Sequence, residues 1–274
     1  MELALPEFDY LRQTVYELSS IIIDPGKEYL AESRLSPVAH EEGFASVQEL
    51  LARMRQGTSM PLRQRVLDAM TNNETSFFRD VAPFEALREI ILPEIIASNS
   101  RDGQLSIWSA ASSTGQEAYS IAMLLDKYFG GLPGWRVKIL ATDISTSALQ
   151  RAREGRYSQM EVSRGLTQEQ LKRYFSNEGA EWKIIDSIRS MVEFRSLNLF
   201  DSWDAIPPCD ILFLRNVLIY FEVEKKKQIL AKVRSILKPT GYVLLGSAET
   251  TLGLDDGFER IQCGPISYCR LKRS

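Results

Sequence analysis

The first 70 residues carry an apolar pattern with helical spacing. Five apolar residues from Phe8 to Ile22 follow one another at intervals of three or four positions, which places them on one face of a helix. Similar sets recur at residues 47–54 and 62–70. We therefore expect residues 1–72 to form an all-helical N-terminal domain.

From about residue 100 the pattern changes to short apolar strands that alternate with amphipathic helices. The expected strands are residues 105–109, 137–141, 211–214 and 242–246. The expected helices are residues 116–129, a helix that Ser145 caps and Gly155 ends, and residues 224–237. A Pro-Thr-Gly turn at residues 239–241 follows the last of them. This alternation predicts an α/β fold with a mostly parallel sheet covered by helices on both faces.

One stretch interrupts the alternation. An expected short helix at residues 167–175 precedes two β-like stretches, residues 182–185 and 191–194. We interpret residues 156–195 as a small β insertion, carried on a sheet domain that spans residues 73–274.

Composition and charge mainly exclude classes of function. A net charge of −3 argues against broad nucleic-acid binding, and His40 as the single histidine argues against a His-centred triad or a multi-histidine metal site. The three cysteines show no CxxC spacing, which favours reduced thiols. The apolar runs are too short to span a bilayer, and the first residues lack a signal-peptide pattern. We expect a cytoplasmic protein without a metal and without direct membrane insertion.

Polar residues follow successive strands at the edge where a doubly wound sheet binds its ligands. The small residues of loop 110–115 follow the first strand and allow a ligand close to the backbone. Asp143 follows the second strand, where an acid either accepts ribose hydroxyls or caps the next helix. Glu117, in the first turn of a helix, either interacts only with the helix dipole or faces a cationic cofactor. Two further strands end at Asn198-Leu199 and Arg215-Asn216.

The densest polar and aromatic run is TNNETSFFRD at residues 71–80, between the helical part and the sheet domain. Such a run, with a buried-looking arginine, is unusual for a linker. The structural alternative is that Thr71 or Asn72 caps a helix, while the two phenylalanines pack the domain interface and Arg79 is solvated.

This run resembles the signature of the CheR family of chemotaxis receptor methyltransferases. The segments IWSAASSTGQEAYS (107–120) and LRNVLIYF (214–221) are similar to two further family blocks, in the same order, and the likeness covers essentially the whole chain. The resemblance implies a class I S-adenosylmethionine (SAM)-dependent methyltransferase domain, Rossmann-like, behind a helical N-terminal domain. The implied reaction transfers the SAM methyl group to glutamate side chains of methyl-accepting chemotaxis receptors, giving glutamate methyl ester and S-adenosylhomocysteine.

The resemblance also assigns site residues. Arg79 and Tyr220 would lie beside the transferring methyl group. The cofactor contacts would fall on Asn73, Thr75, Arg79, Glu117, Asp143, Asn198, Leu199, Arg215 and Asn216. Gln116 and Ala118 depart from the acid and proline often found beside this glutamate. The insertion is shorter than in members that dock onto a receptor's C-terminal peptide, which argues against peptide tethering.

The implied partners are the cytoplasmic signalling helices of chemoreceptors. The basic residues of the N-terminal part are either solvated or form a surface that meets the acidic methylation helices and speeds encounter. These residues are Lys27, Arg34, Arg53, Arg55, Arg63 and Arg65.

Other classes of protein fit the sequence less well. Residues 216–220 lack the prolines of the Asn-Pro-Pro-Tyr motif of amino-methyltransferases. A receptor-binding or SAM-sensing module without turnover is disfavoured because every residue assigned to methyl transfer is present. A nicotinamide-dependent oxidoreductase is disfavoured because the GxGxxG fingerprint is absent.

Overall fold

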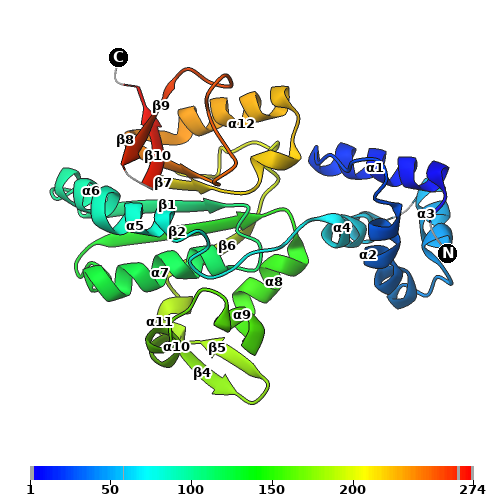
Figure 1. The fold of residues 1–274 in the computed structure, drawn as a ribbon, viewed down its shortest axis with the longest axis horizontal. Helices are drawn as coiled ribbons and strands as arrows, with labels where there is room; N and C mark the ends of the chain where they lie inside the picture. The colour runs from blue at the N-terminus through cyan, green and yellow to red at the C-terminus, as the bar shows by residue number, and fades with distance from the viewer. Residues whose placement is uncertain (1–2, 58, 264–265, 273–274) are drawn as a thin grey trace.

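The computed structural model describes residues 3–57, 59–263 and 266–272. The N-terminal part is all helical, as expected, with a core of its own, in blue in Figure 1. Apolar side chains such as Phe8, Leu35 and Val66 meet there with essentially no exposure. Its helices are α1 (Leu5–Ser19), α2 (Glu28–Glu41), α3 (Val47–Arg55) and α4 (Met60–Met70).

The second part is built on a large mixed sheet, which has seven strands in the described residues. Their order is β6 (Val192–Ser196), β2 (Arg136–Asp143), β1 (Gln104–Ala110), β7 (Cys209–Leu214), β8 (Leu237–Leu245), β10 (Ile266–Leu271) and β9 (Phe258–Cys263). The strands from β6 to β8 are parallel, whereas β10 is antiparallel to both of its neighbours. The strand order reverses between β1 and β7, which is where such sheets bind ligands. The expected Rossmann-like α/β fold is confirmed.

Helices cover both faces of the sheet because alternate strand residues point to opposite sides. Ile107 belongs to the core beneath α7 (Gln116–Phe129), and its neighbour Trp108 to the core beneath α12 (Val223–Ile236). Figure 1 shows these two helices on opposite faces. The remaining helical elements of the sheet domain are α5 (Ala82–Ala86), the π-helical turn η1 (Leu87–Ile91), α6 (Leu92–Ser98), α8 (Thr146–Glu154) and the 3-10 turn η2 (Leu218–Tyr220).

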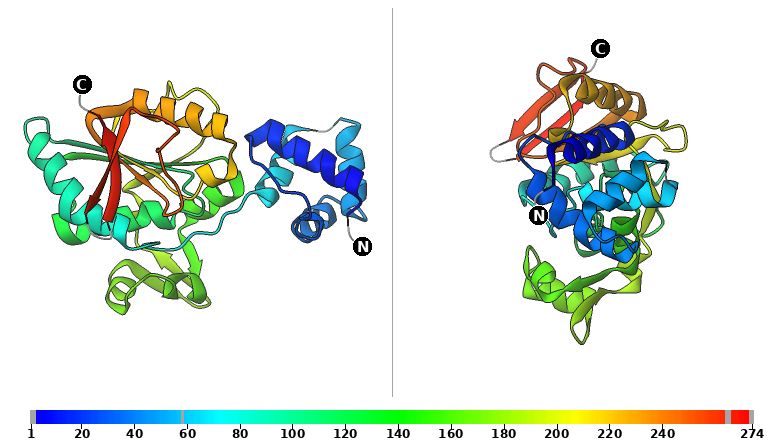
Figure 2. Two further views of the ribbon diagram at one scale, coloured as in Figure 1. Left: turned by 45° about the horizontal axis from the view of Figure 1, so that its top comes forward. Right: turned by 90° about the vertical axis from the view of Figure 1, so that its right-hand side faces the viewer.

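The insertion forms a small unit that projects from the sheet domain in Figure 2 and shares its hydrophobic core. Its antiparallel sheet has the order β3-β5-β4. Its elements are β3 (Arg156–Ser158), α9 (Gln159–Ser163), α10 (Gln168–Tyr174), β4 (Phe175–Glu178), β5 (Glu181–Ile184) and α11 (Asp186–Arg189).

Two details differ from the sequence pattern. Residues 191–194, which the pattern assigns to the insertion, are largely part of β6, whose Val192 pairs in parallel with Ile139 of β2. The turn expected at residues 239–241 lies inside β8, where a bulge shifts the register with β7. A short β-like stretch does not reveal its pairing partner, because strand preference depends on the neighbours that tertiary structure supplies.

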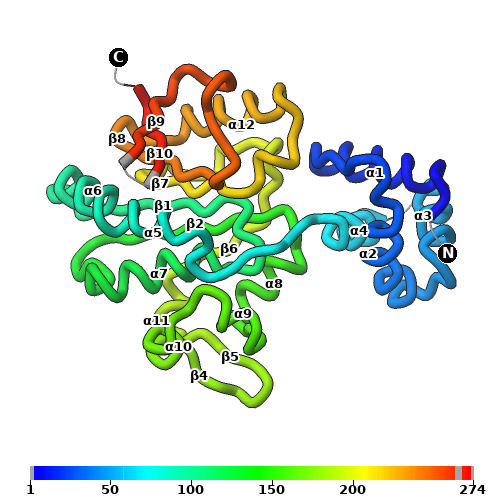
Figure 3. Tube along the Cα trace, viewed as in Figure 1, coloured from blue at the N-terminus to red at the C-terminus, as the bar shows by residue number. Residues whose placement is uncertain are grey.

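The connection between the two parts runs beside the sheet domain as an extended segment, which the tube of Figure 3 follows from α4 to α5. Its backbone is fixed at two points. The Phe78 N–H donates to the Ser120 hydroxyl at 2.9 Å, and the Ser113 hydroxyl donates to the Asn73 carbonyl at 2.8 Å. The polar run is therefore held against α7 and the loop after β1.

Cys209 and Cys269 are buried free thiols, and the side chain of Cys263 lies outside the described residues. No helix of the described residues is both long enough and apolar enough to cross a membrane.

Candidate active site

The loop after β1 has a strained backbone made of small residues. Ala111, Ser113 and Gly115 all have positive φ, at 57°, 52° and 94°. Such conformations are costly for residues other than glycine and cluster at functional sites. A side chain at Gly115 would also place its Cβ 3.0 Å from the Cβ of Ala152. The small residues therefore allow both the tight turn of the loop and its close packing against α8.

Asp143 connects two loops at the ends of β1 and β2. One carboxylate oxygen accepts the Ser113 N–H at 2.7 Å and the other accepts the Ser145 N–H at 2.8 Å. Burial raises the pKa of Asp143, and these N–H donors oppose the rise. The cap of α8 is Ser145, whose hydroxyl accepts the Ala148 N–H. Asp143 is thus not the helix cap, and it lines the pocket described below.

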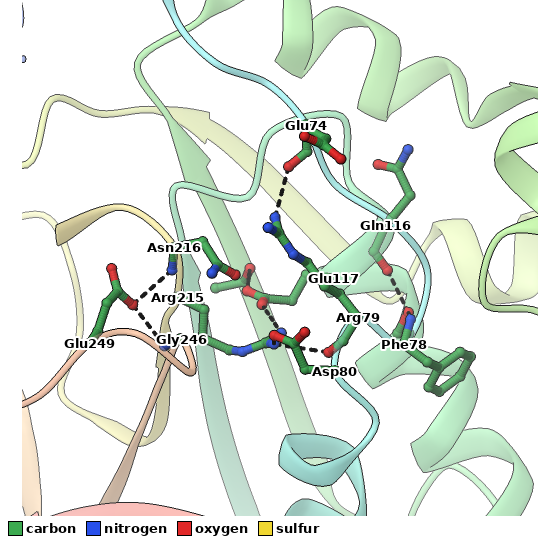
Figure 4. Close-up of polar contacts among 12 residues, drawn as sticks. Glu74, Phe78, Arg79, Asp80, Gln116, Glu117, Arg215, Asn216, Gly246 and Glu249 are labelled. Atoms are coloured by element: carbon green, nitrogen blue, oxygen red, sulfur yellow. Dashed lines mark hydrogen bonds and ion pairs between the residues drawn. The ribbon is translucent and has the colours of Figure 1, made fainter. Parts of the chain in front are cut away.

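Arg215 and Glu117 form a largely buried ion pair at the end of β7, drawn in Figure 4. Their side chains are only 2% and 12% exposed, and their nearest charged atoms lie 2.9 Å apart. The Arg215 guanidinium also binds the Asp80 carboxylate at 2.7 Å and the Arg79 carbonyl at 2.9 Å. Burial raises the pKa of Glu117, while Arg215 and the Ser109 hydroxyl oppose the rise. Glu117 therefore does more than complement the helix dipole.

Arg79 is half-buried rather than buried, and it donates to the Glu74 carbonyl at 2.9 Å. The fully enclosed arginine of the site is Arg215. Among the described residues, no carboxylate lies within ion-pair distance of the Arg79 guanidinium. This charge is available to an anion that enters the pocket.

The two phenylalanines of the polar run have packing roles. Phe77 is completely buried and makes edge contacts with Tyr157 and Phe175 of the insertion. Phe78 packs against Phe84 of α5. Both phenylalanines are thus packing residues, but they pack the insertion and α5 and not the interface with the N-terminal helices that the structural alternative expected.

Tyr220 ends the short turn η2 and contacts both flanking segments. Its hydroxyl accepts a hydrogen bond from the Asn72 side-chain amide at 2.8 Å, and its carbonyl accepts the Ile22 N–H at 3.0 Å. These contacts fix the tyrosine between the polar run and the end of the N-terminal helical part.

A pocket brings most of the assigned residues together at the carboxyl ends of β1, β2 and β7. Those that line it are Asn73, Thr75, Arg79, Glu117, Asp143, Arg215, Asn216 and Tyr220.

Asn198 and Leu199 are not among the residues that line this pocket. The Asn198 side chain donates to the Leu18 carbonyl at 2.9 Å, and Leu199 is buried in the core beneath α12. Both follow β6 at the expected edge of the sheet. Contact with α1 decides where the Asn198 side chain points.

Part of the pocket wall comes from the N-terminal domain, which the sequence analysis did not anticipate because no local motif marks it. Arg34 donates to the carbonyls of Met70 and Thr71 at 3.1 and 3.3 Å. Asp68 of α4 accepts the Ser147 N–H at the start of α8. The lining residues from this domain are Ile21, Ile22, Ile23, Lys27, Leu30, Arg34, Met70, Thr71 and Asn72.

The basic residues of the N-terminal domain are largely engaged inside it. Arg65 pairs with Glu41 and Glu42, and Arg55 binds the Pro6 carbonyl. Lys27 pairs with a neighbouring aspartate at 2.7 Å. Residues 1–72 contain eleven acidic and seven basic side chains. These observations do not support an open basic surface.

The chemistry of the lining fits SAM, which carries a positive sulfonium and a ribose with two hydroxyls. The carboxylates of Glu117 and Asp143 match these two features. Their negative charge complements a sulfonium, and their oxygens accept hydrogen bonds from hydroxyl groups. Two buried polar atoms, Ser112 Oγ and Arg215 Nε, have no partner within the described residues, and both residues line the pocket. Buried polar groups without partners call for an explanation such as a ligand.

Comparison with known proteins agrees with this chemistry. The model of the CheR methyltransferase SAM-binding domain matches residues 73–266, and that of the CheR methyltransferase all-alpha domain matches residues 6–71. The chain is 42% identical over 264 residues to chemotaxis protein methyltransferase Cher2 of Pseudomonas putida, covering 94% of this chain and 95% of that protein. It is 42% identical over 277 residues to chemotaxis protein methyltransferase 1 of Pseudomonas aeruginosa (99% and 100% covered). It is 32% identical over 257 residues to the chemotaxis protein methyltransferase of Escherichia coli (92% and 86% covered). On this evidence, the chain is a member of the CheR methyltransferase family.

Proposed function

We propose that this protein methylates glutamate side chains of chemoreceptors in the cytoplasm, with SAM as methyl donor and S-adenosylhomocysteine as product, for chemosensory adaptation. The acceptors would be glutamates on the receptors' signalling helices. The observation that carries the proposal is the juxtaposition of the Arg79 cation and Tyr220 with the carboxylates of Glu117 and Asp143 in one pocket of a CheR-family chain.

On the cofactor side, the two buried carboxylates have different partners and different expected roles. Bound SAM supplies an electrophilic methyl group on a positively charged sulfur. Asp143, held by backbone N–H groups, would accept ribose hydroxyls. Glu117, held by Arg215 and Ser109, provides negative charge beside a cationic ligand.

On the acceptor side, no general base is needed. A glutamate has a reference pKa of about 4.3 and is already an anion at neutral pH. The residues must therefore align the carboxylate and exclude water, and alignment of this kind contributes up to about 7–11 kcal/mol in well-oriented systems. We assign Arg79 to orient the acceptor carboxylate and Tyr220, held by Asn72, to fix the geometry near the methyl group. Arg79 should orient without pairing tightly, because tight pairing would stabilise the ground-state anion.

The decisive experiment measures transfer of radiolabelled methyl groups from SAM to chemoreceptor-containing membranes, followed by alkaline release of the label. Base-labile label on the receptor that disappears when the target glutamates become alanine is the expected result. Arg79→Ala should lower the transfer rate at least tenfold, about 1.4 kcal/mol. Arg101→Ala, at an exposed arginine before β1, is the matched control and should leave the rate unchanged.

Two outcomes would argue against the proposal. Absence of label on several receptors, despite SAM binding, would point to another methyl acceptor or to a sensing module. Near-normal turnover and SAM affinity in Arg79→Ala would remove the role assigned to that residue.

A further inference from the structure

A buried carboxylate that none of the assigned roles uses lies directly behind the site. Glu249 follows β8 and is only 8% exposed. A tight turn, closed by its own N–H to the Gly246 carbonyl at 2.9 Å, folds its side chain back toward the neighbouring strand β7. Figure 4 shows this carboxylate beside Asn216 and Gly246.

The Glu249 carboxylate accepts four backbone N–H groups. One oxygen binds Gly246 N at 2.7 Å and Asn216 N at 2.8 Å. The other binds Val217 N at 2.9 Å and Leu218 N at 2.7 Å. Three successive N–H groups after β7 thus converge on one anion, an arrangement that backbone turns use to hold negative charge.

The segment that Glu249 holds carries site residues on both of its ends. Arg215, which binds Glu117, precedes it, and Tyr220 ends the η2 turn that begins at Leu218. Within it, Asn216 has a positive φ of 57° and lines the pocket. Asparagine adopts positive φ more readily than most residues with a side chain. The bonds from Asn216 N and Val217 N to the Glu249 carboxylate hold the backbone in this turn.

We propose that Glu249 is a positioning residue for methyl transfer, which fixes the Asn216–Tyr220 segment by joining the ends of β7 and β8. The inference rests on the proposed function for its kinetic consequence. Its structural consequence, an ordered segment 216–220, does not depend on the identity of the acceptor.

Glu249→Gln tests the proposal with little change in shape. The amide keeps one oxygen that accepts two N–H groups, but its NH₂ group then faces the other two donors. Displacement of a positioned group by about 1 Å costs up to about 100-fold in rate. We expect kcat to fall about 10–100-fold and the SAM dissociation constant to rise by a smaller factor, because Asn216 moves with the segment while Glu117 and Asp143 keep their own partners.

Gly246→Ala is a second variant that disturbs the same carboxylate without removing it. A Cβ at this position would lie 2.7 Å from the Glu249 carboxylate and 2.9 Å from Asn216 N. We expect the same pattern, with a larger loss of kcat than of SAM affinity.

Asp210→Asn is the matched control. Like Glu249, Asp210 is a buried acid, but it lies in β7 at the end of the strand away from the pocket. It accepts the Ser106 N–H at 2.8 Å and pairs with Lys238. Replacement of its carboxylate by an amide should lower Tm without changing kcat. A double variant, Glu249→Gln with Tyr220→Phe, should lose less activity than the product of the single losses, because Glu249 acts through the placement of this segment.

Amide hydrogen exchange of residues 215–221 provides a readout that needs no acceptor. Exchange there should become about tenfold faster in Glu249→Gln and Gly246→Ala, and stay unchanged in Asp210→Asn. Unchanged exchange and kcat in Glu249→Gln, or a loss of kcat that Asp210→Asn shares, would overturn the inference. If the wild-type protein methylates no receptor, the proposed function fails, and exchange still decides whether Glu249 holds the segment.

Discussion

At the scale of single residues, the two buried carboxylates of the pocket depend on different partners. Glu117 is balanced by the enclosed Arg215 guanidinium, whereas Asp143 is held mainly by two backbone N–H groups. Removal of one partner of a buried ion pair costs about 3–5 kcal/mol because the other charge is left uncompensated. Protonation of Asp143 leaves no opposite charge uncompensated, which makes Asp143 the better residue for a pH test.

Asp143 should make SAM affinity and the stability of the unliganded protein respond to pH in opposite directions. Burial raises its pKa, so the folded protein binds this proton more tightly than the unfolded chain. The contribution of Asp143 to the free energy of unfolding therefore rises as the pH falls through the raised pKa toward its unfolded value of about 3.9. SAM affinity should fall over the same range, because a protonated carboxyl is a poorer acceptor of two hydroxyls. Calorimetric Kd and Tm between about pH 8 and pH 5 measure both.

Asp143→Asn serves as the comparison for that test. Its SAM affinity should be weak and nearly independent of pH, and its Tm deficit against the wild type should widen as the pH falls. The Lys27 ammonium lowers the pKa of Asp24 below its ordinary value of about 3.9, so Asp24 stays ionised over this range and Asp24→Asn should show no such trend. Parallel pH profiles for the wild type and Asp143→Asn would contradict the assignment.

At the scale of elements, the insertion is joined to the polar run by close packing. Phe77 lies between rings of the insertion, and the Tyr157 hydroxyl donates to the Thr114 carbonyl in the loop after β1 at 2.8 Å. Gly165, between α9 and α10, lies so close that a Cβ there would be 1.9 Å from the Phe77 carbonyl oxygen. The insertion therefore supports the polar run and the loop after β1, both of which line the pocket.

Gly165→Ala should destabilise the protein more than Gly179→Ala. Both glycines belong to the insertion and have positive φ, at 101° and 81°, but a Cβ at Gly179 would meet nothing within 4 Å. The difference isolates the collision with Phe77, and overpacking of this kind costs about 1–3 kcal/mol. Urea denaturation measures it, and SAM affinity should fall only in Gly165→Ala. Equal losses in the two variants would show that the contact is unimportant.

At the scale of the whole molecule, the pocket is completed by both domains. The segment from Ile21 to Arg34 lines it from the N-terminal side, and Asp68 joins α4 to the start of α8. The N-terminal domain carries more acidic than basic side chains. Its charge is therefore unsuited to attract, over long distances, the acidic helices that the proposed function would require as partners.

Receptor methylation should depend only weakly on salt. Electrostatic steering needs opposite potentials on the two partners, so we expect kcat/KM for receptor membranes to change less than about twofold between about 50 and 200 mM salt. Arg65→Glu should act mainly through stability, since it breaks the ion pairs with Glu41 and Glu42. A steep fall with salt, or a loss of receptor affinity in Arg65→Glu at unchanged Tm, would restore the idea of a basic docking surface.

Local sequence pattern predicts the four central strands of the large sheet and the main helices beside them, but not β9, β10 or the elements from α5 to α6. Apolar periodicity predicts the helix at 116–129 with the bounds that α7 has, and Ser145 and Gly155 mark the ends of the next helix. Polar residues after successive strands identify Glu117, Asp143 and Arg215, because parallel strands bring their carboxyl ends to one edge. These features are local, so local pattern and turn chemistry suffice to find them.

Contacts between distant parts of the chain determine which elements meet and where side chains point. The tertiary structure pairs β6 with β2, encloses Arg215 rather than Arg79, and turns Asn198 toward Leu18, 180 positions away in the chain. It also brings Glu249 to the segment after β7. Burial and hydrogen-bond partners of this kind arise from packing between segments distant in sequence, and no short pattern encodes them.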